Sequence, residues 1–466
     1  MKPFVLFDSH LKNKVEFAPE FEGEARIYVC GPTVYDDSHL GHARSAISFD
    51  LLRRLLSHIG YKVTFVRNIT DIDDKILNKM AQTGKSLEEI TNFYSDRYQS
   101  DLEALGVLPP TIEPKATEHI AQMSELIARL LDHKAAYQTQ NGDIYFDVTT
   151  YPQYGFLSGE TQEDTQTRVS TEQKRNSRDF ALWKSAKENE AVSYDSPYGR
   201  GRPGWHLECS AMAQTHLFRS GAKYACDIHA GGSDLFFPHH ENEAAQTKCA
   251  YDNSLSKYWM HNGFVRIDGQ KMSKSLNNGF FVKEALKLFP GEALRFYLMS
   301  IHYRAGLNYN YNDLNASKKR LDRIYRLKKR VDSQNEQAEA IFKEELLSAM
   351  LDDLNISKTL AAIDEMISRG NDILDKNEKD KTAKAVFGGN LKLIRDILGV
   401  GLQDPYEWFQ WGIDEEDKKA IEKLVVDRAV AKANKDYQKA DLIREKLNAI
   451  GVSVMDLSDK TVWEKL

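Results

Sequence analysis

Two short motifs combine residue types that can handle phosphate, and the first is a pair of histidines. His39 and His42 lie three positions apart around Gly41, soon after a short apolar run that ends at Cys30. Helix N-terminal amides attract anions, and a glycine lets another group approach the backbone closely. Imidazoles at such a turn can stabilise charge that develops on a phosphate. Two surface histidines near a helix cap would give the same pattern.

The second motif carries two lysines. Lys271 and Lys274 flank Met272 and Ser273 in a polar stretch that follows a strand-like run. Ammonium groups at this spacing can clamp neighbouring phosphate oxygens as mobile point charges. A solvated basic turn has the same composition, but the two motifs occur in this order on an alternating strand–helix pattern. Together they favour a nucleotide site.

The elements that must position the histidines form one expected β-α-β unit over residues 25–70. A strand is expected at 26–30, then a helix from about Ala43 that ends near Gly60, then a second strand at 61–66. Ligands of open parallel sheets bind beyond the carboxyl ends of the strands. Cys30 and Thr70 follow two such ends, so we expect both to face one crevice.

Length and composition set the broad class. A chain of 466 residues is too long for one hydrophobic core, and 41% hydrophobic and 28% charged residues are ordinary for a soluble protein. The four cysteines form no C-x-x-C pair, which argues against a zinc finger. The apolar runs are too short to span a membrane, and the first residues do not resemble a signal peptide. We therefore expect a cytoplasmic protein, and a net charge of −6 does not exclude a local basic groove.

We predict an α/β fold: a Rossmann-like parallel-sheet catalytic core with an insertion, followed by an α-helical bundle and a small C-terminal domain. The expected parts are the first half of the core at 1–115, the insertion at 116–204, the second half of the core at 205–265, the lysine loop with the region after it at 266–311, the helical bundle at 312–403 and the C-terminal unit at 404–466.

Both motifs match signatures of a known family. Residues 39–42 are similar to the HIGH signature of class I aminoacyl-tRNA synthetases, with leucine for isoleucine, and residues 271–275 match their KMSKS signature in full. Segments 28–36, 67–75, 204–212 and 237–243 resemble the cysteinyl-tRNA synthetase family within that class. The resemblance runs over nearly the whole chain. Ala230 and Asn277 depart from it, since the family has glycine at both positions.

The resemblance implies one zinc ion per subunit. Carried over position by position, its ligands are Cys30, Cys209, His239 and Glu243. His239 and Glu243 are four apart on an expected helix and therefore share a face, and mixed sulfur, nitrogen and oxygen ligands suit zinc. Spacing alone leaves rival ligands, which are Cys226, His229 and His240. We expect Cys226 and Cys249 to be structural thiols, and His240 or Glu241 to support a ligand by hydrogen bonding.

The resemblance also assigns the substrates. The residues that it places at ATP, with Mg²⁺, are His39, Gly41, His42 and Lys274, and the catalytic set adds Lys271. Those that it places around the amino acid are Gly31, Thr70 and Trp205. Core packing is the alternative role for Trp205.

A transfer RNA is the expected macromolecular partner. Basic residues recur at helical spacing after the lysine motif and could follow an RNA backbone, although a solvated helix face is equally compatible: Lys318, Lys319, Arg320, Arg323, Arg326, Lys328, Lys329 and Arg330. By resemblance the C-terminal unit recognises the anticodon, with Lys432, Asp441 and Asp456 as candidates.

The expected function is activation of cysteine with ATP and its transfer to the 3′ end of tRNA(Cys) by a monomer, without a membrane partner. One alternative is a ligase that joins cysteine to an amino sugar through the same adenylate. The long helical part after residue 312 argues against it, because a small acceptor needs no anticodon reader. Another is a zinc-containing tRNA-binding protein without catalysis, which the intact motifs disfavour.

Overall fold

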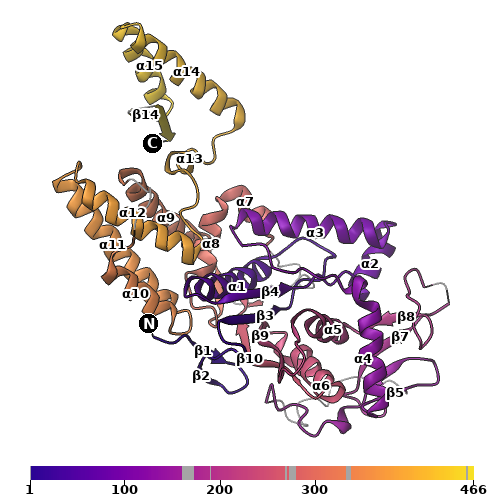
Figure 1. The fold of residues 1–466 in the computed structure, drawn as a ribbon. Coiled ribbons are helices and arrows are strands. Elements are labelled where there is room, and N and C mark those ends of the chain that lie inside the picture. Colours follow the sequence, from indigo (N-terminus) through magenta and orange to yellow (C-terminus); the bar gives the residue numbers. More distant parts are fainter. Residues whose placement is uncertain are drawn as a thin grey trace. The chain divides into compact units, whose positions relative to one another are not determined.

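The computed structural model describes residues 2–159, 173–188, 190–267, 270–271 (backbone only), 280–331, 337–457 and 460–465. The chain forms two compact units (Figure 1). The first contains Met1–Ser317, Glu344–Ala362 and Asp396–Leu398, and the second contains Lys318–Lys343, Ile363–Arg395 and Gly399–Leu466. The six-part division expected from the sequence remains a prediction.

A four-stranded parallel sheet is the centre of the first unit and confirms the predicted α/β fold (Figure 1). Its strand order is β10 (Ser254–Asn262), β9 (Tyr224–Gly232), β3 (Glu24–Val29) and β4 (Lys62–Arg67). Helix α1 (Leu40–His58) connects β3 to β4, and α6 (Glu241–Ala250) connects β9 to β10. The two connections lead away from each other, so the neighbouring ends of β3 and β9 form a switch point where ligands bind.

Several boundaries differ from the sequence expectation. Helix α1 begins at Leu40 rather than near Ala43, because His39 caps it. The strand-like run that precedes the lysine motif is split between β10 and β11 (Val265–Ile267). The break falls at Gly263, where an added Cβ would lie 2.5 Å from the Ala305 carbonyl oxygen. The expected helix of His239 and Glu243 is preceded by a π-helical turn, Phe236–His240, which contains His239, and α6 begins only at Glu241.

The inserted region adds a four-stranded antiparallel sheet. Its strands are β5 (Ala136–Gln138), β6 (Ile144–Phe146), β7 (Phe180–Ser185) and β8 (Gly201–Pro203). Apolar residues of this sheet share one core with α4 (Ile120–Asp132) and α5 (Trp205–Leu217). Gly204 joins β8 to α5, and an added Cβ there would lie 1.8 Å from the Ala181 carbonyl oxygen. The close approach requires glycine and fixes where Trp205 enters the helix.

The remaining helices and strands come before, between and after the strands of these two sheets in the sequence. They are β1 (Val5–Asp8), β2 (Asn13–Glu16), α2 (Asp74–Thr83), α3 (Leu87–Ala104), β12 (Gln270–Lys271), α7 (Val282–Leu288), α8 (Gly291–Met299), β13 (Leu307–Tyr309) and α10 (Ala340–Met350), with 3-10 turns at Ala116–His119 and Val148–Thr150. Strands β12, β11 and β13 form a small three-stranded sheet in that order.

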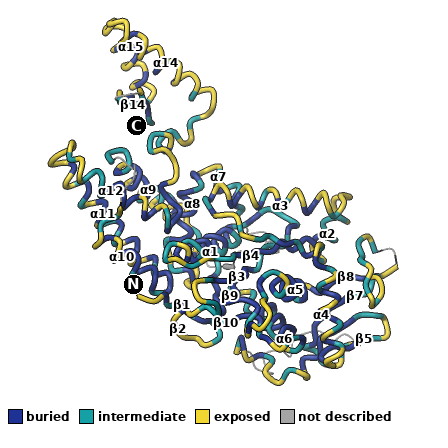
Figure 2. The backbone as a smooth tube through the Cα atoms, in the orientation of Figure 1, coloured by how far each residue is buried: buried dark blue, intermediate teal, exposed yellow. Residues whose placement is uncertain are grey.

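The second unit is helical and ends in a β-hairpin. Its elements, two of which start in the first unit, are α9 (Tyr311–Arg330), α11 (Ile356–Lys376), α12 (Lys381–Leu398), α13 (Pro405–Trp408), α14 (Glu415–Ala433), α15 (Tyr437–Ala449), β14 (Val452–Asp456) and β15 (Thr461–Lys465). Most residues of the four-stranded parallel sheet of the first unit are buried, whereas α14 and α15 carry long exposed stretches (Figure 2). Among the described residues, no helix has the length and apolar character that crossing a bilayer requires.

Candidate active site and metal cluster

A pocket of about 410 Å³ opens at the switch point of the sheet. Its wall includes the residues after β3, the start of α1, the end of β9 and the first residue of α5. The residues predicted from the sequence that line it are Cys30, Gly31, His39, Gly41, His42 and Trp205. The two halves of the predicted site therefore share one cavity.

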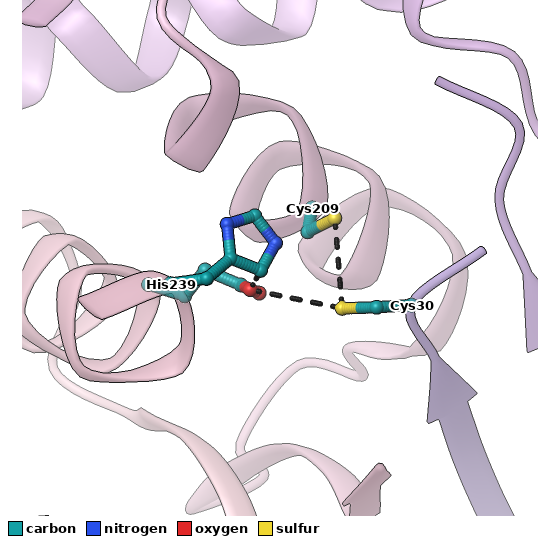
Figure 3. A group of neighbouring side chains, drawn as sticks. Cys30, Cys209 and His239 are labelled. Atoms are coloured by element: carbon teal, nitrogen blue, oxygen red, sulfur yellow. Dashed lines mark hydrogen bonds and ion pairs between the residues drawn. The ribbon is translucent and has the colours of Figure 1, made fainter. Parts of the chain in front are cut away.

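Four side chains that could hold a metal ion converge beside this pocket, and one of them, Cys30, lines it. Figure 3 labels three of the four. Cys30 follows β3, Cys209 lies in α5, His239 lies in the π-helical turn and Glu243 lies in α6. Their ligand atoms all lie within 4.8 Å of one another. Cys30 Sγ is 3.8 Å from Cys209 Sγ and 3.7 Å from Glu243 Oε1. His239 Nε2 lies 2.9 Å from Glu243 Oε1.

The spacing of the donors fits a tetrahedral ion. Two sulfur ligands about 2.3 Å from one zinc ion would be about 3.8 Å apart. The two cysteine sulfurs already have that separation. Cys209, His239 and Glu243 are almost completely buried, whereas Cys30 is partly exposed and lines the pocket. An ion held here would therefore be reached from the pocket on the side of Cys30.

Charge in the cluster is concentrated on three of its side chains. Burial opposes ionisation of Glu243, but the nearby His239 outweighs it and lowers the pKa of Glu243 to about 2. Burial likewise opposes protonation of His239, and Glu243 raises its pKa to about 10. A hydrogen bond from the Cys30 thiol lowers the pKa of Cys209 to about 6, while burial raises the pKa of Cys30.

Two of the rival ligands also reach the cluster. His240 Nε2 lies 3.4 Å from Cys30 Sγ, and His229 Nε2 lies 3.2 Å from Glu243 Oε2. With Cys30 and Glu243 they form a second set of candidate donors. His240 is also joined through Nδ1 to His261 Nε2 at 2.8 Å. Cys226 is different, because its buried Sγ donates to the Leu255 carbonyl and lies in the core.

Trp205 and His206 fix the orientation of His239. The Trp205 ring stacks on the His239 ring with centroids 4.1 Å apart. His206 Nδ1 lies 2.9 Å from His239 Nδ1, so the two rings share one proton on this side. Trp205 remains 38% exposed and lines the pocket, which is not the environment of a core tryptophan.

Gly31 and Thr70 are held together by Asn68. The Gly31 amide donates to Asn68 Oδ1 at 2.8 Å, and Asn68 Nδ2 donates to the Thr70 hydroxyl at 3.2 Å. A Cβ on Gly31 would lie 1.6 Å from the Asn68 carbonyl oxygen, so only glycine fits. Thr70 is 2% exposed and lies behind the pocket wall, where its backbone pairs with that of Thr33.

The two histidines of the first motif cap α1. His39 Nδ1 accepts from the Gly41 amide at 3.1 Å, and His42 Nδ1 accepts from the His39 amide at 3.3 Å. The rings stack with centroids 3.8 Å apart. Because each Nδ1 is an acceptor, each neutral ring carries its proton on Nε2. A Cβ on Gly41 would lie 2.9 Å from the His39 ring, which explains the glycine between them.

Of the lysine motif, only the backbone of Lys271 lies within the described residues. The backbone of Lys271 lies in β12, but its side chain, and both Lys274 and Asn277, lie outside the described residues. Ala230, the other departure from the family pattern, lies within β9 and is fully buried, so the family's glycine run falls in a strand rather than in a loop.

Most charges of the basic stripe on α9 are engaged within the second unit. The ion pairs join Lys318 to Asp322, Arg320 and Arg323 to Asp364, Lys329 to Glu464, and Arg330 to Asp375. Lys328 donates to the carbonyl oxygens of Gly401 and Gln403 at 2.7 and 2.6 Å. Lys319, Arg323 and Arg326 remain exposed. The stripe therefore holds the unit together as well as offering positive charge.

Two of the three anticodon candidates contact each other. Asp456 accepts from Lys432 Nζ at 2.7 Å and from Arg428 Nη1 and Nη2 at 2.8 and 3.0 Å. Hydrogen bonds from Arg428 and then Lys432 lower the pKa of Asp456. Asp441 lies on the exposed surface of α15.

The sequence argument missed several residues of the site. Asn68 supports Gly31, and His206 orients His239, although both lie in segments that carried the family resemblance. Asp234 and Asn262 line the pocket from the ends of β9 and β10. Asn68, Asp234 and Asn262 could have been found from the sequence, because each is a polar residue at or just after the end of a parallel strand. His206 offered no such signal.

Comparisons with known proteins show the family of the chain. The family described as tRNA synthetases class I (C) catalytic domain matches residues 16–319. A cysteine–tRNA ligase of Nitratiruptor sp. is 55% identical over 464 residues, which cover 99% of this chain and 100% of that protein. The cysteine–tRNA ligase of Helicobacter pylori is 52% identical over 462 residues and 99% of both chains.

Solved structures share the fold at low sequence identity. A Mycobacterium tuberculosis methionyl-tRNA synthetase in complex with methionyl-adenylate has a TM-score of 0.59 and 14% identity, covering 85% of this chain and 96% of that one. Relatives at more than half identity cover the second unit as well as the first. The chain therefore belongs to the cysteine–tRNA ligases, a family of class I aminoacyl-tRNA synthetases.

Proposed function

We propose that this protein activates cysteine with ATP and transfers it to the 3′ end of tRNA(Cys). One observation carries the proposal: a single pocket is lined both by Cys30 of the Cys–Cys–His–Glu cluster and by a helix start that bears two histidines. A cysteine molecule has a thiol at one end and a carboxylate at the other. In this proposal the thiol binds at the cluster and the carboxylate binds at the helix start. ATP and the 3′ end of the tRNA also bind at the helix start.

The proposed chemistry begins with the carboxylate of bound cysteine. It attacks the α-phosphorus of ATP in line, forming cysteinyl-adenylate and releasing pyrophosphate. The Nε2–H groups of His39 and His42 are suited to donate to phosphate oxygens as their charge develops, and the N-terminus of α1 adds its own positive field. By family resemblance, Lys271, Lys274 and Mg²⁺ share that task. The 2′-hydroxyl of the terminal tRNA ribose then attacks the activated carbonyl, and AMP leaves.

Zinc is the proposed resident of the cluster, one ion for each chain, held by Cys30, Cys209, His239 and Glu243. When bound, it supplies a soft Lewis acid that prefers the substrate thiolate to a serine hydroxyl. The protein residues orient the site: Trp205 and His206 hold the imidazole of His239, and Gly31 lines the pocket beside Cys30. A site built around a polar group can reject an analogue that lacks it by about 10⁴-fold, so editing is not needed.

The remaining parts of the proposal concern partners. We infer that the second unit binds tRNA(Cys), that Thr70 supports the amino-acid pocket from behind, and that the protein acts as a monomer in the cytoplasm. The amino-sugar ligase receives no support from a particular observation, because the matched cysteine–tRNA ligases cover residues beyond 312.

Pyrophosphate exchange tests the proposal. We expect ATP–pyrophosphate exchange that depends on cysteine, much weaker exchange with serine, and charging of tRNA by cysteine. No exchange with cysteine contradicts an enzyme of this class. Exchange without charging of any tRNA would favour the amino-sugar ligase, and equal exchange with serine contradicts recognition of the thiol by the metal.

A further inference from the structure

A charged side chain just before the histidine motif joins three separate segments. Asp37 Oδ2 lies 2.6 Å from Lys283 Nζ at the start of α7, and Asp37 Oδ1 lies 2.5 Å from Arg97 Nε in α3. The Asp37 side chain is only 12% exposed, while its two partners are 32% and 35% exposed. The carboxylate is therefore held inside and its partners reach it from the surface.

The turn that follows Asp37 and the segment that carries Lys283 are also joined through their backbones. The Val282 amide donates to the Ser38 carbonyl at 2.8 Å, and the Leu40 amide donates to the Phe280 carbonyl at 3.2 Å. His39 and Phe281 form an antiparallel bridge between these hydrogen bonds. The turn that carries His39 is thus paired with segment 280–283, which returns to the core just after the lysine motif.

Asp101 lies beneath this junction. It comes from α3 one turn after Arg97, is 8% exposed and hydrogen-bonds with Ser38. A second carboxylate so close would repel Asp37 if the two cations were absent. The positive charges of Arg97 and Lys283 therefore offset the repulsion between the carboxylates of Asp37 and Asp101.

We propose that Asp37 is a positioning residue that, through Lys283 and Arg97, holds segment 280–283 against the turn of His39 and His42 and so sets the reach of both imidazoles. The inference rests on the proposed function, in which these rings act on ATP. A displacement of about 1 Å at a reacting group can reduce the rate about 10²-fold. The ion pairs of Asp37 with Lys283 and Arg97, which we call the brace, can therefore affect the chemistry although they lie outside the pocket.

A double-mutant cycle tests the brace in the full-length protein. The variants are Asp37→Asn, Lys283→Gln and the pair together, with Lys283→Arg as the conservative variant. We expect each single change to lower kcat for pyrophosphate exchange about 10-fold, with KM for cysteine changed less than about 2-fold. The double variant should fall no further than either single one, because the same interaction is lost. Lys283→Arg should recover most of the rate.

The matched control is Lys14→Gln, which removes the same charge from an ion pair with Asp352 in the first unit, outside the pocket lining. It should leave kcat unchanged. An equal loss in this control, strictly additive losses in the cycle, or an unchanged kcat in Asp37→Asn would each overturn the proposal.

Hydrogen–deuterium exchange gives a readout that does not depend on activity. We expect faster amide exchange in peptides spanning 36–43 and 280–288 of Asp37→Asn and Lys283→Gln, and unchanged exchange in peptides from α11. If the parent protein shows no pyrophosphate exchange, the proposed function fails, and these peptides still decide the positioning role. Unchanged protection in both peptides contradicts it.

Discussion

The two ends of the pocket are built in opposite ways. The proposed metal cluster takes one residue from each of four separate segments, and most of these side chains are almost completely buried. The proposed phosphate end is one short stretch of sequence, in which His39 and His42 cap their own helix and Gly41 makes room for the ring of His39. The cluster therefore depends on the assembled core, whereas the histidine turn is largely defined by its local sequence. Changes at the first end should affect what is bound, and changes at the second how fast it reacts.

The largest effect should follow removal of a cluster thiol. Cys209→Ala is expected to lose the metal and to raise KM for cysteine about 10³-fold, with KM for ATP nearly unchanged, because the site that distinguishes a thiol is gone. Metal content by mass spectrometry and exchange kinetics measure both. Cys249→Ala, at a half-buried thiol outside the cluster, is the control. Retained metal in Cys209→Ala would refute its role as a ligand.

A change at the histidine turn should separate rate from binding. His42→Ala is expected to lower kcat for exchange about 10²–10³-fold, because a donor to developing phosphate charge is lost, with a much smaller effect on KM for cysteine. The exposed His133 provides a control substitution to alanine. A rise in KM for cysteine as large as that of Cys209→Ala would contradict the division between the two ends.

The acid beneath the histidine turn should make stability depend on pH. Burial raises the pKa of Asp101 from 3.8 to about 6. The folded chain therefore binds this proton more tightly than the unfolded chain, so the group becomes destabilising as the pH rises from about 4 through 6. Asp101→Asn should raise the free energy of unfolding by about 1–2 kcal/mol at pH 8 and leave it unchanged at pH 4.

Urea unfolding at both pH values measures this difference. Glu103→Gln, on the exposed side of the same helix, should change neither value. Stabilisation by Asp101→Asn that is equal at pH 4 and pH 8 would show that the carboxyl is not the cause.

The smallest effects should come from the basic stripe of the second unit. Lys319 is exposed, whereas Lys329 is paired with Glu464. We expect Lys319→Gln to raise KM for tRNA about 3-fold and to reduce its salt dependence, because a phosphate contact is lost. Compared with Lys319→Gln, Lys329→Gln should change KM for tRNA less and should lower the thermal stability more, because it removes the ion pair with Glu464. The reverse order would mean that the internal ion pairs open when RNA binds.

Local sequence predicted the phosphate end well. A strand, a turn with glycine and an amphipathic helix appear in order, and the structure contains them with shifts of a few residues. The start of α1 was misplaced because histidine is an unusual cap, so its capping role was not recognised. The brace at Asp37 could not be predicted, since Lys283 and Arg97 are distant in sequence and carry no motif.

The sequence by itself determined the α/β class, the order of the two motifs and, through the family resemblance, the four candidate ligands. It could not choose those ligands by spacing, because His229 and His240 were equally available. Tertiary structure brought Cys30, Cys209, His239 and Glu243 together at one edge of the sheet, yet His229 and His240 also lie at Cys30 and Glu243. The physical reason is that residues on one helix or turn inherit their geometry from the local backbone. Donors from four elements meet only where strand order and core packing bring those elements together.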